Sequence, residues 1–288
     1  MITSEVAASY DEVLSDAKHR FPEVFLPGLH KRICRVAGWV LFVAWVAFCL
    51  FRMELSVPRL WQGIGRLGWL FQFLFPPSHG GCLAEFSYAL LETVSMAFLG
   101  TFLACIAAVP LGFLGARNVI GNPGVHFGVR RFFDFIRGID TLIWALVFIN
   151  VVGLGPFAGV MAIAAGDMGM LAKLFAEAIE NVDARQAEGV LSTGAKRSQV
   201  VCFGILPQVL PVLLSNALYF FESNTRSATI LGVVGAGGIG MQLADRIRIN
   251  NWDEVSFIVG MILVTVAAID WLSREIRMRV IKNPEYRF

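Results

Sequence analysis

Charged residues are scarce in this sequence. Only 16% of its 288 residues are Asp, Glu, Lys or Arg, whereas hydrophobic residues make up 56%. A soluble globular domain carries about 25% charged residues, so the composition excludes an ordinary soluble protein and places the chain in a bilayer. The formal net charge is only +2, and we expect no nucleic-acid partner.

Residues that build metal and catalytic sites are also few. The sequence has five cysteines and four histidines, without a Cys-x-x-Cys pair or any other ligand spacing. We interpret the cysteines as small hydrophobic residues. A membrane-embedded enzyme would need clustered His, Asp or Glu, or a Ser/His/Asp set within its spans. The sparse charges supply neither, so we expect no catalytic residue, no metal site and no enzyme activity on this chain.

Long apolar runs are abundant instead. A membrane helix needs about 20 apolar residues, and the sequence contains six runs of suitable character. They predict spans at 36–51, 88–116, 138–153, 156–176, 206–231 and 255–272. The fold class is therefore an all-α membrane protein with about six transmembrane helices.

The distribution of Lys and Arg predicts the orientation of these spans. If the N-terminus is cytoplasmic, the inner segments hold 18 of the 24 Lys and Arg residues and the outer segments hold six. Cytoplasmic segments carry the excess of positive charge in membrane proteins. We therefore expect a multi-pass protein of the plasma membrane with both termini in the cytoplasm.

A polar segment interrupts the apolar sequence between the fourth and fifth spans. It reads AEGVLSTGAKRSQVVCFGILP, from Ala187 to Pro207. Gly194 permits a sharp reversal of the chain, and Pro207 is tolerated in the first turn of the next helix. The alternative interpretation is an ordinary helical connection with surface charges.

The polar segment resembles the signature of permease subunits of ATP-driven (ABC) importers. That signature runs Glu-Ala-Ala, three residues, Gly, nine residues, Ile, one residue, Leu-Pro. Its fixed positions are matched by Glu188, Gly194, Leu206 and Pro207. The sequence departs from the signature at Gly189-Val190, which replace the two Ala, and at Gly204, which replaces Ile.

The resemblance implies that this loop couples the chain to a cytoplasmic ATPase subunit. It implies two short helices with Gly194 between them, docked in a cleft of the ATPase. The expected coupling residues are Glu188, Gly189, Gly194, Leu206 and Pro207. Gly189 to Lys196 nearly spell a P-loop, but Ala195 separates the second Gly from the Lys. ATP and Mg are therefore expected on the partner ATPase, and no cofactor is expected on this chain.

A glycine-rich segment follows the fifth span. It reads GVVGAGGIG and contains a GxGxxG pattern, but a dinucleotide site needs a preceding strand, and here a membrane helix precedes it. We interpret the segment as a closely packed turn beside the translocation path, and the alternative is a simple helix-breaking loop. The expected gating or hinge residues are Gly232, Gly235, Gly237, Gly238 and Gly240.

The segment before these glycines sharpens the resemblance. Residues 221–229, FESNTRSAT, look like the phosphonate-importer permeases in particular, and residues 153–159 and 206–211 fit the same family. The likeness covers roughly residues 85–275. It implies a type I ABC-importer permease fold in a bacterial inner membrane, working as a homodimer with an external binding protein. The implied cargo is phosphonate or a related phosphorus oxyanion such as phosphite, hypophosphite or a phosphate ester.

Charged residues within spans are costly and need a reason. Glu222 and Arg226 share one helix face, and Glu222 lies about 24 Å along the fifth span from Leu206 at roughly 1.5 Å per residue. This spacing predicts an ion pair in the outer half of the membrane. We expect Arg226, with Asn224, Ser227 and Thr229, to offer donors to the oxyanion while Glu222 holds the guanidinium. The alternative is a structural ion pair or an arginine that reaches the interface.

The sequence thus predicts four regions and leaves one rival function open. The regions are a cytoplasmic N-terminal segment (1–35), a first transmembrane helix and outer segment (36–80), a permease core (81–275) with its coupling loop (183–207), and a cytoplasmic tail (276–288). Membrane lipid surrounds the spans. The rival is a secondary transporter or channel that works without an ATPase. Such a transporter is expected to contain inverted repeats.

Overall fold

The computed structural model describes Arg20, residues 29–53, Pro58, residues 61–65, Gly68 and residues 76–282. The chain divides into two compact units, Met1–Leu70 and Phe71–Phe288. Most of the predicted N-terminal segment (1–35), much of the outer segment (54–75) and the last six residues lie outside the described residues.

The first unit contributes one long apolar helix, α3 (Leu29–Arg52). Its large apolar side chains are exposed within their unit, among them Trp39, Leu41 and Trp45 at 64%, 71% and 68%. An apolar helix without a polar face is a candidate to cross a membrane. The helix predicted for 36–51 is therefore present and longer than predicted.

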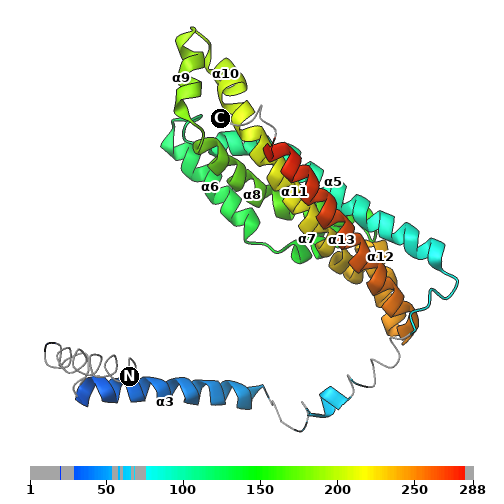
Figure 1. Cartoon of the computed structure of the whole chain (residues 1–288). Coiled ribbons are helices and arrows are strands. Elements are labelled where there is room, and N and C mark those ends of the chain that lie inside the picture. Colours follow the sequence, from blue (N-terminus) through cyan, green and yellow to red (C-terminus); the bar gives the residue numbers. More distant parts are fainter. Residues whose placement is uncertain are drawn as a thin grey trace, which may run out of the picture. The chain divides into compact units, whose positions relative to one another are not determined.

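The second unit is a bundle of helices (Figure 1). Its elements in chain order are α5 (Leu83–Gly115), α6 (Pro123–Arg137), α7 (Thr141–Val152), α8 (Pro156–Glu180), α9 (Ala184–Ser192), α10 (Arg197–Val200), the π-helical turn η1 (Val201–Ile205), α11 (Leu206–Leu231), the π-helical turn η2 (Gly232–Ala236), α12 (Gly238–Arg248) and α13 (Trp252–Lys282). Together with α3, the described residues hold five helices long and apolar enough to cross a membrane, or six if the bent pair α6–α7 forms one span. The prediction of about six spans is confirmed in this form.

The bent pair differs from the single span predicted at 138–153. α6 and α7 meet at an angle of 80°, because Gly138 ends α6 and the Asp140 carboxylate caps the first turn of α7 by accepting from the Leu142 backbone N–H. α7 has only 12 residues, about 18 Å at 1.5 Å per residue. It is too short to cross a core of about 30 Å by itself.

The centre of the bundle is the contact between α5 and α8. Small residues recur at every fourth position of α5 and are buried against α8 or its neighbours: Gly100, Ala104, Ala108, Gly112 and the following Ala116. A Cβ on Gly100 would lie 2.7 Å from Ile163, and one on Gly112 would lie 2.8 Å from Phe175. Small residues at this spacing let membrane helices approach closely. This stripe of small residues fixes the close packing of α5 against α8.

A group of ion pairs at one end of the bundle, which we call the clip, joins α12 to α13. The Nε atom of Arg246 lies 2.5 Å from a carboxylate oxygen of Glu254, and Glu85 lies 3.8 Å from the same guanidinium. Partial burial acts to lower the pKa of Arg246, but the hydrogen bond and the charges of the two acids raise it overall. The clip holds the start of α5 beside the turn between the last two helices.

Candidate functional site

The segment predicted to be the coupling loop forms a helical hairpin, α9 and α10, that projects from one end of the bundle (Figure 1), and we name it the coupling hairpin after that prediction. α9 and α10 are separated by four residues, and Gly194 in that turn has a φ of 82°. This left-handed conformation favours glycine, so the predicted reversal at Gly194 is confirmed. No residue of α9 or α10 is buried, and Leu191 is 54% exposed.

The sequence predicts a membrane helix that begins at residue 206, but the helical segment begins earlier, at Arg197. Pro207 lies in the first turn of α11 as predicted, but α10, η1 and α11 follow one another without a break from Arg197 to Leu231. Proline has no N–H and its ring crowds the carbonyl four residues earlier. Here the turn before it is a π-helix, in which Leu206 N–H donates to the carbonyl of Val201, five residues back. The second arm of the hairpin therefore continues directly into α11.

The two departures from the importer signature have different surroundings. Nothing lies within 4 Å of a Cβ built on Gly189, whereas one built on Gly204 would lie 3.0 Å from the Cα of Ala187. Gly204 thus lets α9 pack directly on the backbone of η1. Gly189 lies on the open face of α9.

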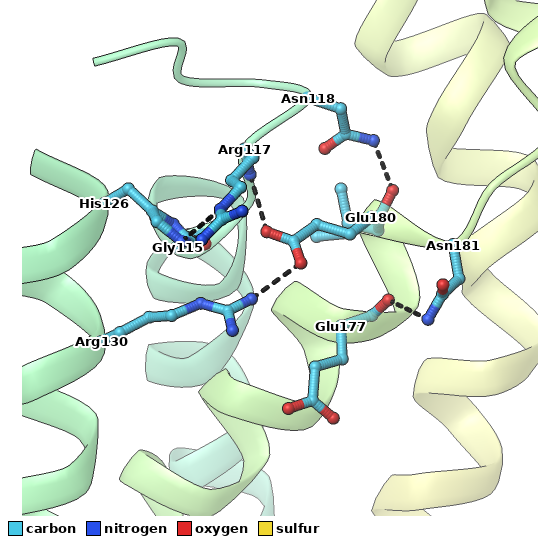
Figure 2. A network of polar contacts seen from close by, with 9 residues as sticks. Gly115, Arg117, Asn118, His126, Arg130, Glu177, Glu180 and Asn181 are labelled. Carbon is cyan, nitrogen blue, oxygen red and sulfur yellow. Dashed lines mark hydrogen bonds and ion pairs between the residues drawn. The ribbon is translucent and has the colours of Figure 1, made fainter. Parts of the chain in front are cut away.

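The base of the hairpin is held by a polar network that the sequence did not predict (Figure 2). Both carboxylate oxygens of Glu180 are used: one accepts from the Arg117 backbone N–H at 2.9 Å and the other from Arg130 at 2.8 Å. Arg117 Nε donates to His126 at 2.8 Å. Asn118 donates to the carbonyl of Ile179 at 2.5 Å. This network ties the end of α5 and the start of α6 to the last turn of α8.

The predicted ion pair is part of a larger charged cluster between α11 and α13. Glu222 lies 2.8 Å from Arg277 and 3.8 Å from Arg226, and Arg226 lies 3.5 Å from Asp270. The tight partner of Glu222 is therefore Arg277. The guanidinium of Arg226 is 49% exposed and makes only long contacts. The expectation that Glu222 holds the guanidinium of Arg226 is corrected in this respect: Asp270 is a second partner of Arg226, and the shorter contact of Glu222 is with Arg277.

Asn224 faces the opposite side of α11 from Arg226. It is 5% exposed and donates to the hydroxyl of Thr101 at 2.8 Å and to the carboxylate of Asp167. Two residues along a helix differ by about 200° around its axis at 3.6 residues per turn. The structure therefore does not bring Asn224 together with Arg226. Ser227 and Thr229 donate to carbonyls of their own helix, at 3.4 Å and 3.3 Å.

The contact with Asp167 shows where Asn224 lies along the length of the bundle. Asp167 lies eleven residues from the start and thirteen from the end of α8, Pro156–Glu180. Asn224 beside it is thus near the middle of the bundle, and the depth of the Glu222–Arg226 pair in the membrane stays a prediction. α8 continues past Gly166 and Asp167 without a break.

The glycine-rich segment is a tight reversal between α11 and α12. Gly235, Gly237 and Gly238 have φ values of 108°, 81° and 70°. A Cβ on Gly232 would lie 2.8 Å from the Cα of Gly240, and one on Gly240 would overlap the carbonyl of Thr229. The segment is closely packed, which agrees with the first of the two interpretations. Its role in gating stays a prediction.

Two residues of α5 hold this reversal in place. The carboxylate of Glu92 accepts from the Gly238 N–H at 3.1 Å, and the hydroxyl of Thr93 accepts from the Ile239 N–H at 2.8 Å. They satisfy donors at the N-terminus of α12 that lack a partner within the helix. An acidic residue is also favoured there by the helix dipole. The only sequence signal for this contact is an ionisable residue in an apolar run.

Comparison with known proteins places this arrangement in context. Residues 108–281 match the family described as binding-protein-dependent transport system inner membrane component. HtxC of Stutzerimonas stutzeri, whose name suggests a permease protein of a phosphite transport system, is 34% identical over 276 residues, which cover 93% of this chain and 96% of that protein. The phosphate-import permease protein PhnE of Mycolicibacterium smegmatis is 38% identical over 212 residues, which cover 74% of this chain and 40% of that protein.

A solved structure shares the fold. A chain of the MetNI methionine ABC transporter, solved in an inward-facing form, matches with a TM-score of 0.62 over 68% of this chain and 95% of that chain. The identity is 22%, so this likeness concerns the fold alone.

Proposed function

The chain belongs to the family of binding-protein-dependent transport system inner membrane components, and we propose that two copies of it form the membrane path of an ATP-driven importer for a phosphorus oxyanion. The predictions of a permease subunit and of a type I importer fold are confirmed by this family and by the fold match. The partners, the orientation and the cargo are the proposal.

The observation that carries the proposal is the projecting α9–α10 hairpin. Its exposed residues include Glu188, Gly189 and Gly194, and the continuous helix from Arg197 joins it to α11. A cytoplasmic ATPase that grips this hairpin would move α11 as a rigid body, and such rigid-body movements switch transporters between states. ATP and Mg belong to that ATPase.

The cargo is proposed from the relatives and from Arg226. The names of HtxC and PhnE refer to phosphite and phosphate, and both are small phosphorus oxyanions, as is a phosphonate, hypophosphite or phosphate ester. A guanidinium suits such an anion because its planar fork can donate two parallel hydrogen bonds. Arg226 is half-exposed and held only by contacts of 3.5 Å and 3.8 Å, so it can turn toward a passing anion. The hydroxyls of Ser227 and Thr229 lie on the same turns of α11, and Gly232 to Gly240 would form the hinge.

The test of the coupling proposal uses the purified complex in liposomes. We expect a cytoplasmic ATPase and an external binding protein to copurify with the chain. Glu188→Lys should uncouple ATP hydrolysis from the external substrate, while Arg279→Gln, at an exposed position of α13, should not. Uptake by the chain alone, without ATP, would instead establish the rival secondary transporter.

The test of the cargo proposal compares oxyanions in the same complex. Arg226→Gln should lower oxyanion uptake about tenfold or more, because a charge-assisted hydrogen bond contributes about 1.5–3 kcal/mol. Arg226→Lys should recover part of the activity. Unchanged uptake in a properly assembled Arg226→Gln complex would assign Arg226 to a structural role.

A further inference from the structure

We propose that a pocket between the loop after α5 and the start of α6 binds the phosphate headgroup of an anionic membrane lipid. The pocket has a volume of about 650 Å³. Its lining contains Arg117, Arg130 and Arg131 together with Pro123, His126 and Phe127, and no acidic side chain. The connection between α5 and α6 lies at the end of the bundle that carries the coupling hairpin (Figure 1).

Among the described residues, no acidic side chain forms an ion pair with the Arg117 guanidinium. One carboxylate oxygen of Glu180 accepts from the Arg117 backbone N–H, and the other accepts from the Arg130 side chain. The Arg117 side chain donates to His126 Nε2 through Nε, so Nε2 must accept, and Nδ1 donates to the Gly115 carbonyl at 2.9 Å. The imidazole therefore bridges Arg117 to the end of α5 and holds the Arg117 side chain. Within the described part of the chain, the two terminal nitrogens of Arg117 have no partner.

A second carboxylate near the pocket, that of Asp134, is shared among three cations. We call this group of charged side chains around the pocket the cationic corner. Asp134 lies 3.0 Å from Arg131, 3.1 Å from Lys173 and 4.0 Å from Arg137. One negative charge cannot neutralise three positive charges. The corner therefore keeps an excess of positive charge, and it faces the pocket through Arg131, whose side chain is 64% exposed.

Two further features point to phosphate as the ligand. The buried Nε of Arg130 has no hydrogen-bond partner among the described residues. Pro123 is the first residue of α6, so the positive end of this helix also faces the pocket. Arginine forks and helix N-termini are both preferred by phosphate groups.

The surroundings favour a lipid over a free anion. α6 exposes Phe127, Phe132 and Phe135 at 65%, 48% and 69%, and the Arg131 guanidinium stacks over Phe127 at 5.5 Å. Aromatic rings among acyl chains with arginines at the headgroup level are typical of a membrane interface. Such a lipid would bridge α5 and α6 beside Glu180, four residues before α9. It would stabilise the base of the coupling hairpin.

The experiment measures lipid binding to the purified full-length chain by native mass spectrometry. The probes are phosphatidylglycerol and phosphatidylcholine, and the expected result is selective retention of phosphatidylglycerol. The Arg117→Gln/Arg131→Gln variant should lose affinity by roughly fivefold for each arginine, as expected for basic residues at an anionic surface. Arg137→Gln is the matched control, because Arg137 contacts the same Asp134 but does not line the pocket.

A lysine pair separates lost binding from a folding defect. Arg117→Lys/Arg131→Lys keeps both charges and should restore most of the binding. Equal retention of phosphatidylcholine, an equal loss in Arg137→Gln, or displacement of the lipid by millimolar inorganic phosphate would each overturn the proposal. These readouts are independent of transport, so they do not depend on which oxyanion is carried.

Discussion

Single residues decide how closely the helices of this bundle approach one another. At Gly204 and Gly240 the neighbouring backbone occupies the place of a side chain, whereas Gly189 and Gly260 have open space there. The sequence alone does not distinguish these two kinds of glycine, because the difference depends on which helix lies opposite. Replacing glycine by alanine is therefore expected to have opposite effects on stability at the two kinds of position.

Gly189→Ala should stabilise the protein. The position lies within α9, and alanine in a helix interior is favoured over glycine by about 0.5–1 kcal/mol. Thermal unfolding of the purified chain in detergent should show a small rise in melting temperature. Coupled ATP hydrolysis should persist, since the importer signature itself has alanine there. A fall in melting temperature would show that the α9 surface is not free.

Asn224 and Asp167 should behave as a coupled pair. Asn224→Ala leaves the Asp167 carboxylate without its donor inside the bundle, at a cost of about 1–3 kcal/mol. Removing both partners in Asn224→Ala/Asp167→Ala should cost less than the sum of the single changes, because no unpaired group remains. Unfolding free energies of the four proteins in one detergent complete the cycle. Strict additivity would mean that the hydrogen bond contributes nothing.

At the scale of elements, the apolar runs predicted most of the helices. They did not predict the helix boundaries that are set by polar contacts. The long spans at 88–116, 156–176 and 206–231 are confirmed because bilayer thickness sets their length. The bend between α6 and α7 depends on the Asp140 cap, and the continuity of α8 depends on a partner for Asp167 from another helix. Contacts between residues 57 positions apart leave no local pattern, so the charged cluster and the network of Figure 2 were not predictable in detail.

The reversal between α11 and α12 should tolerate no side chain at Gly240. A Cβ there meets the Thr229 carbonyl and lies 3.0 Å from the Cα of Gly232, and backbone atoms cannot move aside like a flexible side chain. Overpacking of this kind costs about 1–3 kcal/mol or more. Gly240→Ala should therefore lower the melting temperature. Gly260→Ala within α13 is the matched control and should be neutral or stabilising. Equal effects of the two changes would contradict the close packing.

At the scale of the whole molecule, the two ends of the bundle differ in chemistry. The end with the coupling hairpin gathers cations in excess of acids, at Arg117, Arg130, Arg131, Arg137 and Lys173. The other end balances Arg246 with Glu254 and Glu85. Positive charge concentrates on the cytoplasmic side of membrane proteins. The three-dimensional distribution of charge therefore favours the same orientation as the count along the sequence.

Native cysteines offer a direct measurement of that orientation. Cys202 is exposed in η1 beside the coupling hairpin, and Cys82 directly precedes α5 at the opposite end. α5 has 33 residues, about 50 Å at 1.5 Å per residue, so the two thiols lie on different sides of a core of about 30 Å. Single-cysteine variants with the other four cysteines changed to Ser should each be labelled from one side only.

A membrane-impermeant maleimide should label Cys82 in intact spheroplasts and Cys202 only in inverted vesicles. The membranes should come from cells that express the permease without its ATPase, so that no partner covers the hairpin. The reverse pattern would place the hairpin outside, where no cytoplasmic ATPase could reach it, and the coupling proposal would fail with it. Labelling of both cysteines from one side would mean that α5 does not cross the membrane. Because the hairpin, the start of α11 and the cationic corner lie at one end of the bundle, this single result fixes the side of all three.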